Sequence, residues 1–288
     1  MASASSETVP AAAPVFGAAI QGGRAEQQDS FRSVWLSGEN AWLLIVADGM
    51  GGHAAGAVAS RIAADTFVSA FTAKREAGAS LEQALEEALE DANQQIARAQ
   101  EEAPETAGMG TTLVAAYVSP QGVAWISVGD SPLWLIRKGT IERMNEDHSF
   151  RPAVAKGAKA SANVLQSALN GDEIALIDLQ PKPRRLRTDD VVIMASDGLL
   201  TLTEREIASC VVKSAHGDAE TIARTLLQAV EQRAEPNQDN CTVLVAAAAG
   251  PDIDAHSATS SVYGLIGAAT VILAGVASIA GYLFWRAP

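Results

Sequence analysis

Three apolar runs of this chain each end at an aspartate in a turn, and this pattern restricts the folds available to it. The runs with their aspartates are 42–47 with Asp48, 123–128 with Asp130, and 191–195 with Asp197. Short apolar runs bounded by glycine and aspartate are typical of buried β-strands. Strands that end at a common edge would each deliver one carboxylate to the same place. The sequence therefore predicts a β-rich core with an acidic cluster at one edge.

Two further aspartates, Asp29 and Asp239, stand in similar turn-like contexts. One such residue is explained by ordinary turn chemistry, because aspartate favours turns before glycine or asparagine. The set of five favours a shared purpose. An all-oxygen cluster suits hard cations such as Mg²⁺ or Mn²⁺ rather than zinc, and paired hard metals hydrolyse phosphate esters.

Composition excludes several classes of protein. The chain has 288 residues, a length that suits one large domain or two small ones, and 48% of them are hydrophobic. Its net charge of −13 argues against a nucleic-acid-binding protein, which needs a basic face. Cys210 and Cys241 lie in apolar segments, so no disulfide framework is implied.

The apolar spacing predicts alternating strands and helices. Helices are expected at 54–71, 81–102, 204–212 and 219–233. The second of these is the clearest, with an apolar stripe from Leu81 to Ile96 and a capping box of Ser80 and Gln83. Strands are expected at two places in 15–36 and at 41–47, 111–118, 123–128, 133–137, 140–144, 164–168, 173–179, 191–194 and 241–248. Residues 145–163 show no firm periodicity.

Four regions are expected along the chain. Residues 1–14 predict a disordered tail, 15–250 a globular domain, 251–262 a linker and 263–285 a transmembrane tail anchor. The last segment carries no charge and has aromatic residues near its ends, which suits a bilayer core of roughly 30 Å. The alternative is a buried core helix. A tail anchor would place the membrane-attached globular domain in the cytoplasm.

Six motifs, in order and at plausible spacings, resemble the metal-dependent serine/threonine protein phosphatases of the type 2C family in their bacterial form. Each motif alone is a weak signal, but the six together are specific, and they cover residues 15–248. The motifs are Arg24-Ala-Glu-Gln-Gln-Asp29, Val46-Ala-Asp48-Gly-Met-Gly-Gly-His53, Met109-Gly-Thr-Thr112, Ser127-Val-Gly-Asp130-Ser131, Ala195-Ser-Asp197-Gly-Leu199 and Asp239-Asn-Cys-Thr242.

The resemblance implies a fold and a set of site residues. The fold is an α+β, four-layer α-β-β-α sandwich of two antiparallel sheets flanked by helices, to which the sequence adds the C-terminal transmembrane helix. The cofactor is two or three Mn²⁺ or Mg²⁺ ions. By resemblance, the metal ligands are Asp48, the Gly49 carbonyl, Asp130, Asp197 and Asp239. Asp29 resembles an outer-shell acid that holds metal-bound water, and Arg24 is the candidate for binding the substrate phosphate.

Some residues keep a second interpretation or depart from the family. Arg24 is alternatively a surface arginine paired with a nearby acid such as Glu26. His53 is either an acid–base group or a helix-start residue that caps local backbone. Gln27, Gln28 and Pro132 stand where the family usually has Asn, Glu and Arg, and the segment between Asp130 and Asp197 is short, which puts peptide preference in question.

The expected activity is hydrolysis of phosphoserine and phosphothreonine in proteins, opposing a Ser/Thr kinase. The expected partners are phosphorylated proteins, such a kinase and a membrane, with no nucleic acid. The alternative is a catalytically weak phosphoprotein-binding signalling module with the same fold. A membrane protein whose soluble part is only structural would leave the six motifs unexplained.

Overall fold

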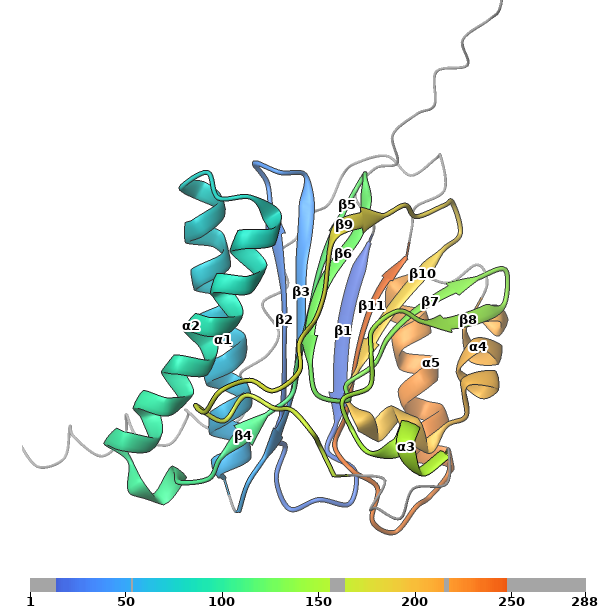
Figure 1. The fold of residues 1–288 in the computed structure, drawn as a ribbon. Coiled ribbons are helices and arrows are strands. Elements are labelled where there is room, and N and C mark those ends of the chain that lie inside the picture. Colours follow the sequence, from blue (N-terminus) through green and yellow to red (C-terminus); the bar gives the residue numbers. More distant parts are fainter. Residues whose placement is uncertain (1–13, 53, 156–163, 215–217, 248–288) are drawn as a thin grey trace, which may run out of the picture. The chain divides into compact units, whose positions relative to one another are not determined.

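The computed structural model describes residues 14–52, 54–155, 164–214 and 218–247. Within them the chain forms two antiparallel β-sheets with helices outside both (Figure 1). The first sheet has the order β1 (Val15–Ile20), β11 (Cys241–Ala247), β10 (Val191–Ala195), β7 (Leu133–Arg137) and β8 (Thr140–Arg143). The second has the order β2 (Asp29–Leu36), β3 (Ala41–Met50), β5 (Leu113–Ser119), β6 (Gly122–Val128) and β9 (Asp178–Arg184), and the short β4 (Gly110–Thr111) pairs with the end of β3.

Two pairs of helices cover the outer faces. The long helices α1 (Ala55–Glu76) and α2 (Leu81–Glu102) pack on the second sheet, and α4 (Glu204–Lys213) and α5 (Ala219–Gln232) pack on the first (Figure 1). Shorter turns lie near the strand ends, namely α3 (Arg151–Ala155), η1 (Pro104–Thr106) and η2 (Asp197–Thr201). The expected capping box at the start of α2 is confirmed, since Ser80 Oγ accepts from the Gln83 backbone N–H at 3.1 Å.

The alternation of side chains along the strands produces three separate cores. On β3, Leu43 and Ile45 pack under α1 and α2, whereas Leu44 and Val46 join the core between the sheets. The same alternation on β10 and β11 sends one set of side chains toward α5 and the other toward the opposite sheet. Because successive side chains point to opposite faces, fully apolar strands are buried on both sides and hold the two sheets face to face.

The expected fold class is corrected in its membrane component. Among the described residues, no helix combines the length and the apolar surface needed to cross a bilayer. The two longest of the described helices, α1 and α2, are long enough but carry charged residues along one face, which covers the second sheet's outer side with a polar surface. The predicted anchor at 263–285 lies outside the described residues, as do the linker 251–262 and residues 1–13 of the predicted tail.

Two strand predictions in the middle of the chain were wrong. Residues 164–168 form only an isolated bridge at Leu165, and the predicted strand at 173–179 is displaced to β9. β9 contains Pro181 and Pro183, which argue against a strand in sequence-based reasoning. It is the edge strand of its sheet, where a missing backbone donor is tolerated, and its register against β6 shifts between Val123 and Trp125.

Candidate active site

Four of the five aspartates line one cavity of about 710 Å³. Its walls come from the ends of β3 and β6, the start of η2, the loop before β11, and the segment 164–170. The sequence-predicted residues along it are Arg24, Asp48, Gly49, Asp130, Asp197 and Asp239. The tertiary structure therefore brings together residues that lie far apart in the chain.

Asp48 is held at the cavity by hydrogen bonds from both sides of its peptide unit. Its backbone N–H donates to Thr112 Oγ1 at 3.0 Å. Its carbonyl oxygen accepts from the Thr112 N–H and from Thr111 Oγ1, both at 2.9 Å. Thr111 and Thr112 of the Gly110-Thr111-Thr112 motif thus fix the backbone of Asp48 through hydrogen bonds. Burial raises the pKa of Asp48 well above its usual range, and the negative charges of Asp29 and Asp197 add to this effect.

Asp29 is buried and lies directly opposite Asp48 in the register of β2 and β3. Its Oδ2 accepts from Ser196 Oγ at 2.7 Å and from Thr242 Oγ1 at 2.8 Å, which ties the second sheet to the first. Its Oδ1 is buried without a hydrogen-bond partner among the described residues. Burial raises the pKa of Asp29 to about 6, although the two hydroxyl groups act in the opposite direction. An acid with one satisfied and one open oxygen suits the predicted outer-shell role.

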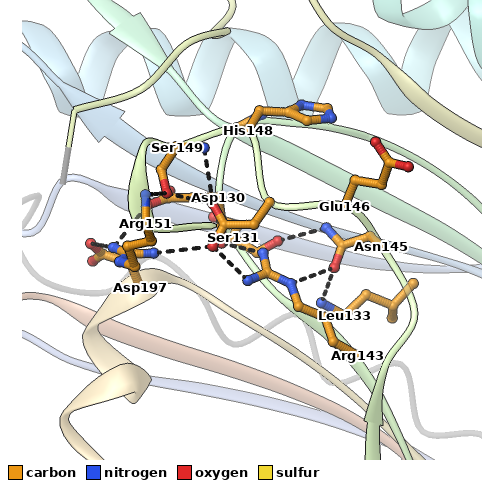
Figure 2. Close-up of polar contacts among 12 residues, drawn as sticks. Asp130, Ser131, Leu133, Arg143, Asn145, Glu146, His148, Ser149, Arg151 and Asp197 are labelled. Carbon is orange, nitrogen blue, oxygen red and sulfur yellow. Dashed lines mark hydrogen bonds and ion pairs between the residues drawn. The ribbon is translucent and has the colours of Figure 1, made fainter. Parts of the chain in front are cut away.

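Asp130 and Asp197 follow β6 and β10, and their carboxylates share a cationic neighbour. The Arg151 Nη2 lies 3.0 Å from Asp130 Oδ2 and 3.4 Å from Asp197 Oδ2 (Figure 2). Burial raises the pKa of Asp130, and Arg151 partly offsets the rise. Burial, together with the charge of Asp130, raises the pKa of Asp197 to about 6. The two side chains therefore form one electrostatic unit.

Arg24 pairs with Asp239 rather than with the acid beside it in the chain. Its Nη2 lies 2.6 Å from Asp239 Oδ2, and its side chain is 56% exposed at the margin of the cavity. Asn240 secures the loop that carries Arg24, because its Oδ1 accepts from the Gln28 N–H and its Nδ2 donates to the Gln21 and Glu26 carbonyls. The alternative pairing of Arg24 with Glu26 is not what the structure has.

The side chains fit hydrated Mg²⁺ or Mn²⁺ better than a closed metal cage. Within the described part of the chain, no three His, Cys, Asp or Glu side chains converge closely enough to enclose one ion. Mg²⁺ usually keeps several waters and takes only one or two carboxylates from the protein. An oxygen-rich cavity along which four carboxylates are spaced apart matches that requirement. No cysteine or histidine is among the described residues that line the cavity, and Cys241 is buried in the core under α5.

Other residues shape the site without having been predicted. Arg151 lies in the stretch where the sequence showed no periodicity, so no local signal pointed to it. Asn240 was visible only as part of the Asp239-Asn motif. His148, to which no catalysis was assigned, is buried and accepts from the Gly129 N–H through Nδ1 at 3.3 Å, which is a structural contact. His53 lies outside the described residues.

The two-sheet sandwich with an acidic cavity at one end of its strands is the arrangement expected of a metal-dependent phosphoesterase. The sequence pattern of the family Protein phosphatase 2C matches residues 17–231, and the chain belongs to this family. The expected resemblance is confirmed. The chain is a serine/threonine protein phosphatase of this type.

Several relatives agree with this assignment. The serine/threonine phosphatase stp of Listeria welshimeri is 30% identical over 223 residues, which are 74% of this chain and 86% of the relative. The crystal structure of the serine/threonine phosphatase Stp1 from Staphylococcus aureus is 30% identical, covers 83% of this chain and 96% of its own, and superposes with a TM-score of 0.70. The catalytic domain of the phosphatase PstP, at 25% identity and a TM-score of 0.69 over 83% of this chain and 99% of its own, was solved in complex with two manganese ions.

Proposed function

We propose that this cavity hydrolyses phosphoserine and phosphothreonine esters in proteins with bound Mn²⁺ or Mg²⁺, opposing a Ser/Thr kinase. The observation that carries the proposal is the placement of four aspartates and an exposed arginine along one cavity. The manganese in the PstP structure and the phosphatase names of the relatives support it.

The metals have a defined set of candidate ligands. Asp48, the Gly49 carbonyl, Asp197 and Asp239 would hold the ions, and Asp130 would hold an additional, weaker one. When bound, the ions supply Lewis acidity that activates water near neutral pH and stabilises charge on the phosphoryl oxygens. The protein contributes positioning, since the peptide of Asp48 is fixed by Thr111 and Thr112.

The remaining site residues orient the substrate and the nucleophile. The planar guanidinium of Arg24 can contact two phosphate oxygens, and its exposure leaves it accessible to a phosphoprotein. The open Oδ1 of Asp29 accepts a hydrogen bond from water, and Ser196 and Thr242 fix the direction of that carboxyl group. No protein nucleophile is required, so neither cysteine takes part.

The test is manganese-dependent release of phosphate from phosphoserine, phosphothreonine and phosphotyrosine peptides. We expect Asp197→Ala and Asp239→Ala each to lower turnover at least about a hundredfold, because each removes a ligand from an electrostatic site. Both proteins should remain folded by circular dichroism. Asp65→Ala is the matched control, since Asp65 is an exposed aspartate on α1 that pairs only with Arg32 in the described structure.

Retained turnover in both site variants would remove the metal assignment. A wild-type protein that binds phosphopeptides tightly but releases no phosphate with any divalent ion would favour the signalling-module alternative. The partner kinase and a cytoplasmic position of the domain stay predictions.

A further inference from the structure

Arg151 lies at a place where the site needs a cation. It is the first residue of α3, and one of its nitrogens contacts carboxylate oxygens of both Asp130 and Asp197, at 3.0 and 3.4 Å (Figure 2). These two acids come from different sheets, one at the end of β6 and the other after β10. A single positive atom therefore bridges two carboxylates across the junction of the sheets.

A hydrogen-bond network aims this side chain at the acids. The Arg151 backbone N–H donates to Ser149 Oγ at 3.1 Å, and Ser149 Oγ donates to Asp147 Oδ1 at 2.6 Å. The other oxygen of Asp147 accepts from Arg143 Nη1 at 2.9 Å and lies 3.7 Å from Arg151 Nη1. Arg143 in turn donates to the Asp130 carbonyl at 2.8 Å. Ser149 thus holds the backbone of Arg151, and Asp147 lies beside its guanidinium and is linked through Arg143 to the Asp130 carbonyl.

The contacts of the guanidinium are chiefly ionic. Its Nη1 is buried and has no hydrogen-bond acceptor among the described residues. Arginine usually satisfies its donors when it is placed for structural support. Arg151 is partly buried, and its Nη2 lies between two carboxylates, so its place is better explained by its charge, which offsets the repulsion between Asp130 and Asp197.

We propose that Arg151 is an internal counter-ion that occupies the place of a divalent ion between Asp130 and Asp197. Its charge lowers the affinity of this pair for the additional Mn²⁺, so that tight metal binding is confined to the ions held by Asp48, Asp197 and Asp239. The inference rests on the proposed function, because it takes these aspartates as metal ligands. In this role Arg151 does not contact the substrate; its charge sets how many ions the protein holds.

The test is a titration of the full-length chain with Mn²⁺ alone. Calorimetry measures the binding, and electron paramagnetic resonance measures the Mn²⁺ that remains free. We expect Arg151→Met to bind one more Mn²⁺ than the wild type, or to bind its weakest ion at least about tenfold more tightly. Arg151→Lys keeps a positive charge and should stay close to the wild type. The double variant R151M/D130N should lose the gain. Arg184→Met is the control, since Arg184 pairs with Glu142 on the edge strands.

Several outcomes would overturn the inference. The first is that the wild type and Arg151→Met bind the same number of Mn²⁺ ions with the same affinities. The second is that Asp130→Asn binds one tight Mn²⁺ ion fewer than the wild type. The Asp130→Asn measurement also decides the question if Arg151→Met fails to fold. If Arg151 already neutralises Asp130, removing the charge of Asp130 should leave the number of tightly bound Mn²⁺ ions unchanged. Phosphate release is measured on the same samples. An active wild type without these differences overturns this inference alone, whereas a wild type that neither binds Mn²⁺ nor releases phosphate overturns the proposed function as well.

Discussion

Gly49 shows how a single residue sets the geometry of the site. A Cβ atom at this position would lie 2.1 Å from the Gly56 carbonyl oxygen and 2.6 Å from the Gln28 carbonyl oxygen. Both neighbours are backbone atoms, which cannot rotate away. The contact is close from the other side as well, because a Cβ atom added at Gly56 would lie 2.9 Å from the Gly49 carbonyl carbon. These two glycines let the end of β3 touch the start of α1 and so place Asp48 and the Gly49 carbonyl at the cavity.

We therefore expect Gly49→Ala to lower the free energy of unfolding by about 1–3 kcal/mol, because the added methyl group overpacks a backbone contact. Turnover should fall with it, since Asp48 must shift. Gly38→Ala is the matched control, because a Cβ there meets no atom within 4 Å and the change should stay within about 0.5 kcal/mol. Urea unfolding measures both variants. Equal stability of the two would contradict the close approach.

At the scale of elements, one polar cluster joins three parts of the second sheet's outer layer. Glu39, in the turn between β2 and β3, accepts from Arg75 near the end of α1, with Nη2 at 2.7 Å, and from the Tyr117 hydroxyl of β5 at 2.8 Å. Burial alone would raise the pKa of Glu39, but the hydrogen bonds from Arg75 and Tyr117 outweigh it and lower the pKa. The ionised carboxylate thus holds α1 and β5 to the same turn.

We expect Tyr117→Phe to cost about 1–2 kcal/mol at pH 7, because it removes a hydrogen bond to a charged group. A carboxyl group whose pKa is lowered by folding stabilises the protein above its unfolded pKa of about 4.3 and loses this contribution as the pH falls through the folded pKa. The deficit of the variant should therefore shrink below about pH 4. Urea unfolding across pH 3.5–7 measures it. In a Glu39→Gln background the deficit should be nearly independent of pH, and a constant deficit in the parent background would exclude this role of Glu39.

At the scale of the whole molecule, repulsion within the acidic cluster lowers the stability of the metal-free fold. Asp29 and Asp48 from the second sheet face Asp197 and the loop of Asp239 from the first, so the two sheets bring like charges together. Burial and these neighbours raise the pKa of Asp29 and of Asp197 to about 6. The apolar core between the sheets supplies the attraction that holds them against this repulsion.

We expect the metal-free protein to lose stability as the pH rises from about 4 to above 6, and Mn²⁺ to restore it. An acid whose pKa is raised by folding binds its proton more tightly in the folded state, so stability falls as the pH rises from the unfolded to the folded pKa. A cation that binds only the folded state offsets the loss. Melting temperatures with EDTA or with Mn²⁺ at pH 5 and pH 8 measure this. The shift caused by Mn²⁺ should be larger at pH 8, and it should shrink in Asp48→Asn. An equal shift at both pH values would contradict the proposed ligands.

Much of the fold was predictable where a local pattern encodes it. The strands that lead to Asp48, Asp130 and Asp197 are apolar runs, although β3 continues through Asp48 to Met50, and helix α2 has a regular stripe with its own cap. The edge strand β9 was misplaced because its prolines contradict strand propensity and only its position at the edge permits them. The transmembrane part of the expected fold class has no counterpart among the described residues, and the segment 263–285 lies outside them.

The sequence by itself determined which chemical groups the protein has available, namely five aspartates in turn-like contexts, three of them after apolar runs, a glycine turn and an early arginine. Together these resemble the family. Only the tertiary structure decided which groups meet. It paired Arg24 with Asp239 and placed Arg151 between Asp130 and Asp197. The physical reason is that turn preference and apolar alternation are local properties of a segment's sequence, whereas the electrostatics of a site depends on distances between strands that the packing of two sheets sets.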